Sequence, residues 1–175
     1  HDSQILVALT FARAGDATQA SKIADELAKR YPEDTLVNSY WLTSIRASVE
    51  ISRNNPGKAV EVLQAVGPYE FGAPTPAPNV QAMMYPTYVR AQAHLAMKKG
   101  KEAATEYQKI IDHRTLVANF ITGPLAHLGL GRAYALAGDD AQAKTAYQDF
   151  FALWKDADPD IPILKQAKEE YEKLQ

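Results

Sequence analysis

The sequence predicts an all-α protein: four helical hairpins in a row, closed by one further helix. Three observations lead to this fold. A turn motif occurs twice, far apart in the chain; two weaker copies lie between them; and an amphipathic stripe ends the sequence. Apolar residues on both sides of each turn recur with the period of an α-helix, so each turn joins two helices that share a buried face.

The two best turns are spelled almost alike. Gly15–Ala20 reads Gly-Asp-Ala-Thr-Gln-Ala, and Gly138–Ala143 reads Gly-Asp-Asp-Ala-Gln-Ala. Glycine ends the helix before the turn, because it adopts the left-handed conformation without the steric cost of a Cβ atom. The aspartate is a typical N-cap of the next helix, and the glutamine stands where a capping box places it. Each segment therefore predicts a tight turn between two helices.

Two further turns have the same layout. Asn55 is a cap residue followed by Pro56, and proline suits the first helical position because its missing N–H has no partner there. Lys99-Gly100 opens the other copy. A small residue begins the second helix of each hairpin at intervals of roughly 40 residues, as expected for a helical repeat. These residues are Ala20, Ala59, Ala103 and Ala143.

We expect one domain over residues 1–175, with hairpins at about 2–33, 34–67, 84–112 and 124–156. A proline-rich insert over 67–86 separates the second and third hairpins, and Pro74–Pro78 should run extended. Residues 113–123 are too apolar for a free loop and should fold back on the array. A helix over 160–174 should cap the last hairpin. Its apolar stripe is Ile161, Leu164, Ala167, Tyr171 and Leu174.

This pattern resembles the tetratricopeptide repeat (TPR), a helical hairpin with Gly and Tyr in its first helix and Ala and an aromatic in its second. The last hairpin matches best, with Gly131, Tyr134, Gly138, Ala143 and Tyr147, and the first offers Phe11, Gly15, Ala20, Leu27 and Pro32. In the other two hairpins, residues such as Glu50, Asn54, His94 and Lys98 replace the signature tyrosine and glycine. The resemblance implies a right-handed TPR-like α-solenoid that binds partners in a concave groove.

A closer resemblance covers essentially the whole chain. It rests on Asn38–Leu42, the proline-rich insert, Tyr107–Ile110 with Asp112–Arg114, and Trp154–Pro162. These segments are similar to the C-terminal repeat region of eukaryotic-like serine/threonine protein kinases from acidobacteria. The resemblance implies a signalling role in a bacterial receptor kinase, on the extracytoplasmic side of the membrane; attached to another regulator, the array would be cytoplasmic. Since the chain begins at His1-Asp2, we expect it to be part of a longer protein.

Composition excludes several function classes. The chain has 19 Lys and Arg against 21 Asp and Glu, a net charge of −2, which disfavours a nucleic-acid partner. It has no cysteine, which removes disulfides, cysteine-ligated zinc and thiol chemistry. No apolar run approaches the roughly 18 residues of a membrane-spanning helix, so we expect no membrane contact by this segment.

The residues also predict no catalytic, cofactor or metal site. Kinase machinery is missing, because Asp112-His113-Arg114 has the letters of a catalytic loop in the wrong order and no Gly-rich phosphate loop is present. There is no Gly-x-Ser-x-Gly elbow. His94, His113 and His127 are dispersed, so packed histidines are favoured over a metal site. The carboxylate pairs Asp139-Asp140 and Glu169-Glu170 are interpreted as caps or as a solvated face.

A binding surface remains. The family's groove positions fall on a set that includes aromatic and arginine side chains, the types that anchor interfaces. The predicted partner-binding residues are Trp41, Ser48, Tyr85, Tyr88, Gln92 and Arg132. The competing interpretation packs Trp41 and Tyr88 between repeats. Ile5 and Leu9 stand at the first groove positions, where a chaperone-binding clamp has lysine and asparagine, so that role is disfavoured.

The predicted function is thus non-catalytic binding of a protein, peptide or small ligand by a TPR scaffold, with no cofactor. The alternative is a self-association module that pairs two copies of a regulator. A third interpretation is an enzyme with a site between the proline-rich insert and the groove, although no tight cluster of titratable residues points to one.

Overall fold

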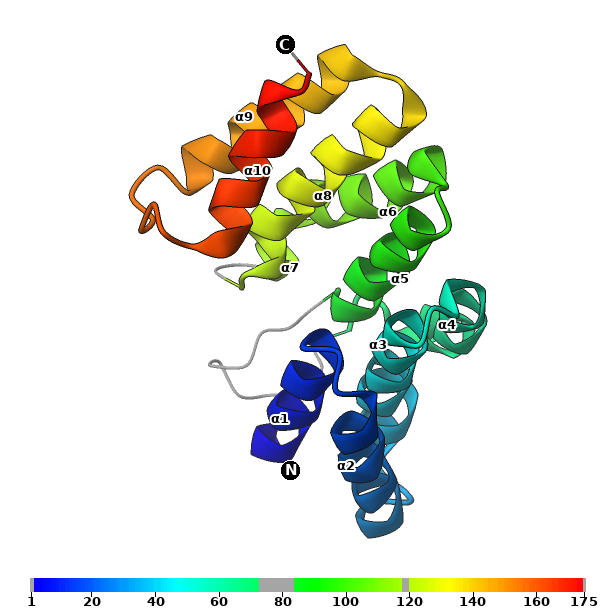
Figure 1. Cartoon of the computed structure of the whole chain (residues 1–175). Coiled ribbons are helices and arrows are strands. Elements are labelled where there is room, and N and C mark those ends of the chain that lie inside the picture. Colours follow the sequence, from blue (N-terminus) through cyan, green and yellow to red (C-terminus); the bar gives the residue numbers. More distant parts are fainter. Residues whose placement is uncertain (1, 73–83, 118–119, 175) are drawn as a thin grey trace.

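The computed structural model describes residues 2–72, 84–117 and 120–174, and this part of the chain contains helices and no strand (Figure 1). The predicted all-α TPR-like solenoid is confirmed. The helices are α1 (Asp2–Arg13), α2 (Ala17–Arg30), α3 (Thr43–Ser52), α4 (Pro56–Leu63), α5 (Tyr85–Ala96), α6 (Gly100–Asp112), α7 (Arg114–Val117), α8 (Thr122–Ala137), α9 (Asp140–Leu153) and α10 (Pro162–Glu172). A π-helical segment η1 (Val37–Leu42) leads into α3, and a 3₁₀ segment η2 (Gln64–Tyr69) follows α4.

Each hairpin turn contains one residue in the left-handed conformation. Gly15 and Gly138 have φ values of 84° and 79°. Asn54 and Lys98, which replace glycine in the two middle hairpins, have φ values of 63° and 61°. The four turns therefore share one backbone geometry even where the sequence signature is lost.

The predicted N-caps are confirmed in the first and last hairpins. Asp16 Oδ1 accepts a hydrogen bond from the Gln19 N–H at 3.0 Å, and Asp139 Oδ1 accepts one from the Gln142 N–H at 3.1 Å. Each bond satisfies a backbone donor that the first turn of a helix leaves without an intrahelical partner.

Small residues allow helices to pack closely, both within a hairpin and between neighbouring hairpins. All four signature alanines are fully buried. Gly129 and Gly131 of α8 face the rings of Tyr107 and Tyr147, where an added Cβ atom would lie 2.3 Å and 2.8 Å from the nearest ring atom. The glycines thus provide the space into which the aromatic rings of the facing helices pack.

A π-helical turn shapes the first helix of the second hairpin. Asp34 Oδ1 accepts a hydrogen bond from the Val37 N–H at 2.9 Å, and Asn38 Nδ2 donates to the carbonyls of Tyr31 and Asp34. Tyr40 and Trp41 lie within the widened turn, Val37–Leu42, and both are buried. Their rings meet edge-on, with centroids 4.9 Å apart.

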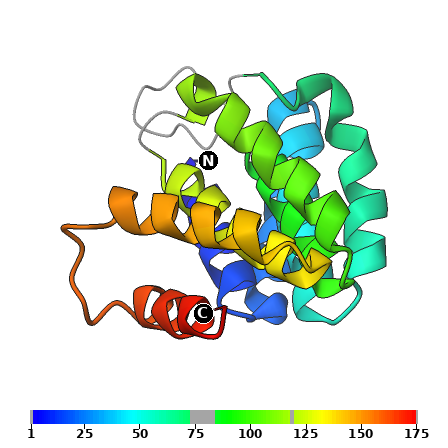
Figure 2. The same cartoon turned by 90° about the horizontal axis from the view of Figure 1, so that it is seen from above.

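The array bends so that its two ends approach one side (Figures 1 and 2). Helices α1 to α4 form one half, α6 to α10 form the other, and α5 lies between them. Each half has its own apolar core, and Phe120 packs against both. Figure 2 shows that α10 is joined to α9 by a loop, residues 154–161, that arches away from the other helices.

No helix in the described ranges is long and apolar enough to span a membrane.

The two interruptions differ in detail from the expectation. The proline-rich insert is not irregular from its start, because η2 continues through Gly67 and Pro68. Residues 74–78, expected to be extended, lie outside the described residues. Within 113–123, α7 packs on α6 and α8 and Val117 is buried, as expected for a segment that folds back on the array.

Candidate functional site

The concave side of the array holds a cavity of about 620 Å³. Its walls come from the end of α1 and the turn after it, from α3, α5, α6 and α8, and from Ile163 at the start of α10. These elements belong to all parts of the chain, and the bend of the solenoid brings them to one side (Figure 1). The cavity is therefore a product of the superhelix and not of a single hairpin.

The structure gathers four of the six predicted groove residues here. Ser48, Tyr88, Gln92 and Arg132 line the cavity. Trp41 and Tyr85 do not line it; they are 3% and 2% exposed and belong to the core of the first half or its border with α5. Ile5 and Leu9 of α1, which the family pattern places at groove positions, are also buried in this core.

Two tyrosines form the floor of the cavity. The ring of Tyr88 meets that of Tyr107 edge-on, with centroids 5.9 Å apart. Burial raises the pKa of both phenols, although the charge of Arg132 acts in the opposite direction on each. Because the phenols stay neutral, each keeps a hydroxyl proton to donate. Gln92 Nε2 reaches the Tyr88 hydroxyl at 3.5 Å, so the amide and the phenol lie side by side.

Arg132 is held by a carboxylate from the last helix. Its Nε and Nη2 donate to the two oxygens of Glu170 at 2.7 and 3.0 Å, and the Tyr147 hydroxyl donates to the same carboxylate at 2.9 Å. Burial lowers the pKa of Arg132, but the hydrogen bonds and charge of Glu170 outweigh it, and the net shift is upward. The expectation that Glu170 is simply part of a solvated face is wrong, because this side chain is half-buried and ties α10 to α8.

Arg13 stands on the opposite wall. It is exposed at the end of α1, and within the described ranges its guanidinium has no ion pair or hydrogen bond. Its positive charge lowers the pKa values of Tyr85 and Tyr88 against the larger effect of burial, which places the charge near both phenols. Sequence reasoning missed Arg13, because it lies one turn beyond the groove positions of the first helix.

A buried charge network lies elsewhere, where η2 meets the third hairpin. Glu70 accepts hydrogen bonds from Thr87 Oγ1 and Arg90 Nη2, and Arg90 also pairs with Glu106 at 2.8 Å. Lys109 lies 3.5 Å from Glu106 and 3.7 Å from Glu70. With two acids and two bases the network is neutral, so it fixes η2 against α5 and α6 without a free charge to offer a ligand.

The histidines are separate packing residues. His94 and His127 are partly buried, and burial lowers the pKa of both. His127 Nδ1 lies 3.7 Å from Asp149 Oδ2. Across the part of the chain that the structure describes, no three His, Asp or Glu side chains gather as metal ligands would.

Comparison with known families agrees with this architecture. A tetratricopeptide repeat model matches residues 2–34 and 125–156, which are the first and last hairpins. The match supports a tetratricopeptide repeat protein. No curated protein matches the chain. Repeats of this kind generally mediate protein–protein interaction, and the two matched hairpins supply opposite walls of the cavity, with Arg13 on one and Arg132 on the other.

Proposed function

We propose that the chain is a non-catalytic scaffold that binds a peptide segment of a partner protein in the concave cavity. The observation that carries this proposal is that one cavity collects polar and aromatic side chains from the first helices of three hairpins, namely Ser48, Tyr88, Gln92 and Arg132. A volume of about 620 Å³ lies within the range of ligand-binding clefts and accommodates a few side chains of an extended segment.

The resemblance to the repeat region of bacterial serine/threonine kinases gives this scaffold a context. In such a parent the array would be the sensor or docking region, and segment binding in the groove would be its input. The proposal is supported by the similarity of the segments quoted above, which span the chain. The sequence of the same gene upstream of His1 tests it: kinase motifs followed by an apolar span of about 20 residues are expected.

A panned peptide library tests segment binding. Gln92→Trp should fill the cavity, since Gln92 lies on its wall and its side chain makes one long hydrogen bond, to Tyr88, among the described residues. The matched control is Gln108→Trp, because Gln108 of α6 lines a different cavity. Peptides selected on the wild-type protein should bind the Gln108 variant and fail to bind the Gln92 variant. Equal binding to both variants would contradict the groove as the site.

Self-association is the second candidate, favoured by two exposed apolar side chains on α1. Leu6 and Val7 are 38% and 46% exposed, which is high for large apolar side chains. Light scattering at micromolar concentration should then report a dimer that Val7→Ser converts to a monomer. A monomeric wild-type protein would remove this candidate and leave the groove proposal intact.

A further inference from the structure

The charge of the cavity wall differs from that of the whole chain. The chain carries a net charge of −2, whereas the residues that line the cavity include two arginines and no aspartate or glutamate. A cleft lined by one sign of charge concentrates oppositely charged ligands.

One of the two arginines, Arg132, is already paired with a carboxylate of the chain, that of Glu170. The charge of Arg132 is compensated by Glu170, whose two oxygens accept from Nε and Nη2, and the Tyr147 hydroxyl and Gln166 Nε2 donate to the same carboxylate. This contact shows that a carboxylate is bound at this end of the cavity by the guanidinium of Arg132 together with the phenol of Tyr147. It also neutralises Arg132, so the excess positive charge of the cavity belongs to Arg13.

Hydrogen-bond donors without a fixed acceptor gather on the Arg13 side. The guanidinium of Arg13 has no hydrogen-bond or ion-pair partner among the described residues. Arg13 and Tyr88 line the same cavity, and the charge of Arg13 lowers the pKa of the neutral Tyr88 phenol against the larger effect of burial. Gln92 adds an amide, one N–H of which donates to the Tyr88 hydroxyl at 3.5 Å while the second remains for a ligand. The nearby Ser48 and Ser52 hydroxyls instead donate to the carbonyls of Ser44 and Val49. A guanidinium beside a phenol favours an anionic acceptor, and a carboxylate fits its planar fork.

Apolar walls indicate that the anion belongs to a larger ligand. Ile51, Leu95 and Leu128 line the same cavity and offer contacts to aliphatic side chains next to the charged one. A small free anion would leave these surfaces unused.

We propose that the groove selects acidic peptide segments, with a ligand carboxylate bound by Arg13 and apolar neighbours packed against the wall. This inference rests on the proposed function and names its partner class. Arg13 determines specificity, while Arg132 is occupied within the chain.

The experiment compares random-peptide libraries panned on wild type, Arg13→Gln and Arg13→Glu. Arg114→Gln is the matched control, because Arg114 is also exposed and lines a different cavity. Wild type and the Arg114 variant should enrich Asp and Glu, Arg13→Gln should lose that enrichment, and Arg13→Glu should reverse it toward Lys and Arg. The best acidic peptide should bind Arg13→Gln about 10- to 100-fold more weakly, the range for loss of a charged hydrogen-bonded pair.

The outcomes separate the two proposals. Peptides that are lost with Gln92→Trp but carry no acidic excess would overturn the acidic-segment inference and leave segment binding standing. Acidic enrichment that survives Arg13→Gln would overturn the role of Arg13. If no selected peptide depends on Gln92, the proposed function itself fails. Circular-dichroism melting curves that superimpose for wild type and Arg13→Gln would show that the variant is folded.

Discussion

Arg132 in α8 and Glu170 in α10 form a two-point ion pair, with Nε–Oε2 at 2.7 Å and Nη2–Oε1 at 3.0 Å. This pair lies where the last helix meets the wall of the cavity. Leu164 and Ala167 of α10 are buried, and the partly buried Ile163 and Tyr171 also pack against the core of the second half. The Glu170 carboxylate adds a polar contact to this apolar packing and ties α10 to α8.

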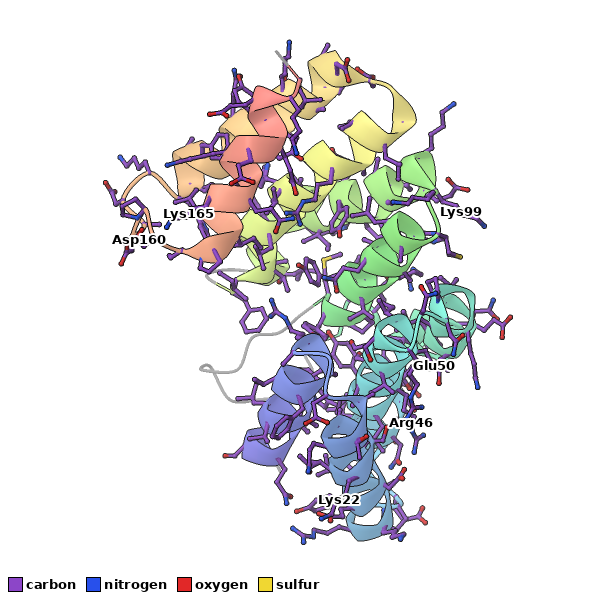
Figure 3. The ribbon with its side chains drawn as sticks, in the orientation of Figure 1. Lys22, Arg46, Glu50, Lys99, Asp160 and Lys165 are labelled. Carbon is purple, nitrogen blue, oxygen red and sulfur yellow. The ribbon has the colours of Figure 1, made fainter. Side chains whose placement is uncertain are left out.

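Glu170→Gln should loosen α10. The substitution removes the counter-charge of Arg132 and replaces one of the two acceptor oxygens with an amide NH2 group, which cannot accept from Arg132 or Tyr147. The loss of charged hydrogen bonds costs about 1.5–3 kcal/mol of unfolding free energy. Urea denaturation measures the loss, and limited proteolysis of residues 154–161 should become faster. Lys165→Gln is the control, since the Lys165–Asp160 pair is exposed at the edge of the molecule (Figure 3) and such pairs contribute about 0–1 kcal/mol. Equal losses in the two variants would contradict this role of Glu170.

Lys98→Gly should stabilise the third hairpin, or at least cost nothing. Lys98 adopts a φ of 61°, a conformation that costs a residue with a Cβ atom roughly 1–2 kcal/mol, whereas glycine adopts it freely. The larger entropy of glycine in the unfolded chain offsets part of this gain, by about 0.5–1 kcal/mol. Thermal melting measures the balance. Lys168→Gly is the control, because Lys168 is exposed in the interior of α10, where glycine costs about 1 kcal/mol. A lower melting temperature for the Lys98 variant than for the Lys168 variant would contradict the argument.

These turns show what local sequence does predict. A helix end, a cap and a small residue are properties of a few adjacent positions, so Gly15-Asp16 and Gly138-Asp139 predict two turns directly. Asn54 and Lys98 carry no glycine signature, yet the spacing of the repeats places them correctly. The helical hairpins were therefore predictable because their determinants are local and repeated.

The groove was only partly predictable, because its residues depend on helix phase. A π-helical turn contains more residues than an α-helical turn and rotates the residues beyond it. Trp41 lies within this turn, Val37–Leu42, and is buried in the core, so the regular spacing of the family pattern does not give its position. The partners of Arg132 and Glu70 were not predictable, since each pair is far apart in sequence and meets only after the array bends.

Gly100→Ala should separate the third and fourth hairpins. An added Cβ atom would lie 2.7 Å from the Ala133 carbonyl oxygen and 2.8 Å from the Ala137 nitrogen, and both are backbone atoms that cannot rotate away. Overpacking of this kind costs about 1–3 kcal/mol. Gly57→Ala is the matched control at the start of α4, because its nearest neighbour would be Met97 Sδ at 4.0 Å. That variant should keep or slightly raise the wild-type melting temperature, and a similar fall in both would contradict the close approach at Gly100.

Glu70→Gln should change how stability depends on pH. Burial raises the pKa of Glu70, but the Thr87 hydrogen bond and the charges of Arg90 and Lys109 lower it more, and the net pKa lies below the ordinary value of 4.5. As the pH falls, the unfolded chain takes up this proton first, so the stabilisation is complete above about 4.5 and is lost as the pH passes through the lower, folded-state pKa. At neutral pH the variant should lose roughly 2–3 kcal/mol, because Arg90 keeps its charge with one carboxylate fewer.

The measurement is the unfolding free energy of wild type, Glu70→Gln and Glu61→Gln at several pH values between about 7 and 3. Glu61 is exposed on α4 and takes part in no ion pair within the described ranges, so its variant should follow the wild-type curve. The gap between wild type and the Glu70 variant should be widest at neutral pH and close toward acid. A gap that stays constant with pH would mean that the Glu70 carboxylate is not held ionised by Arg90 and Lys109.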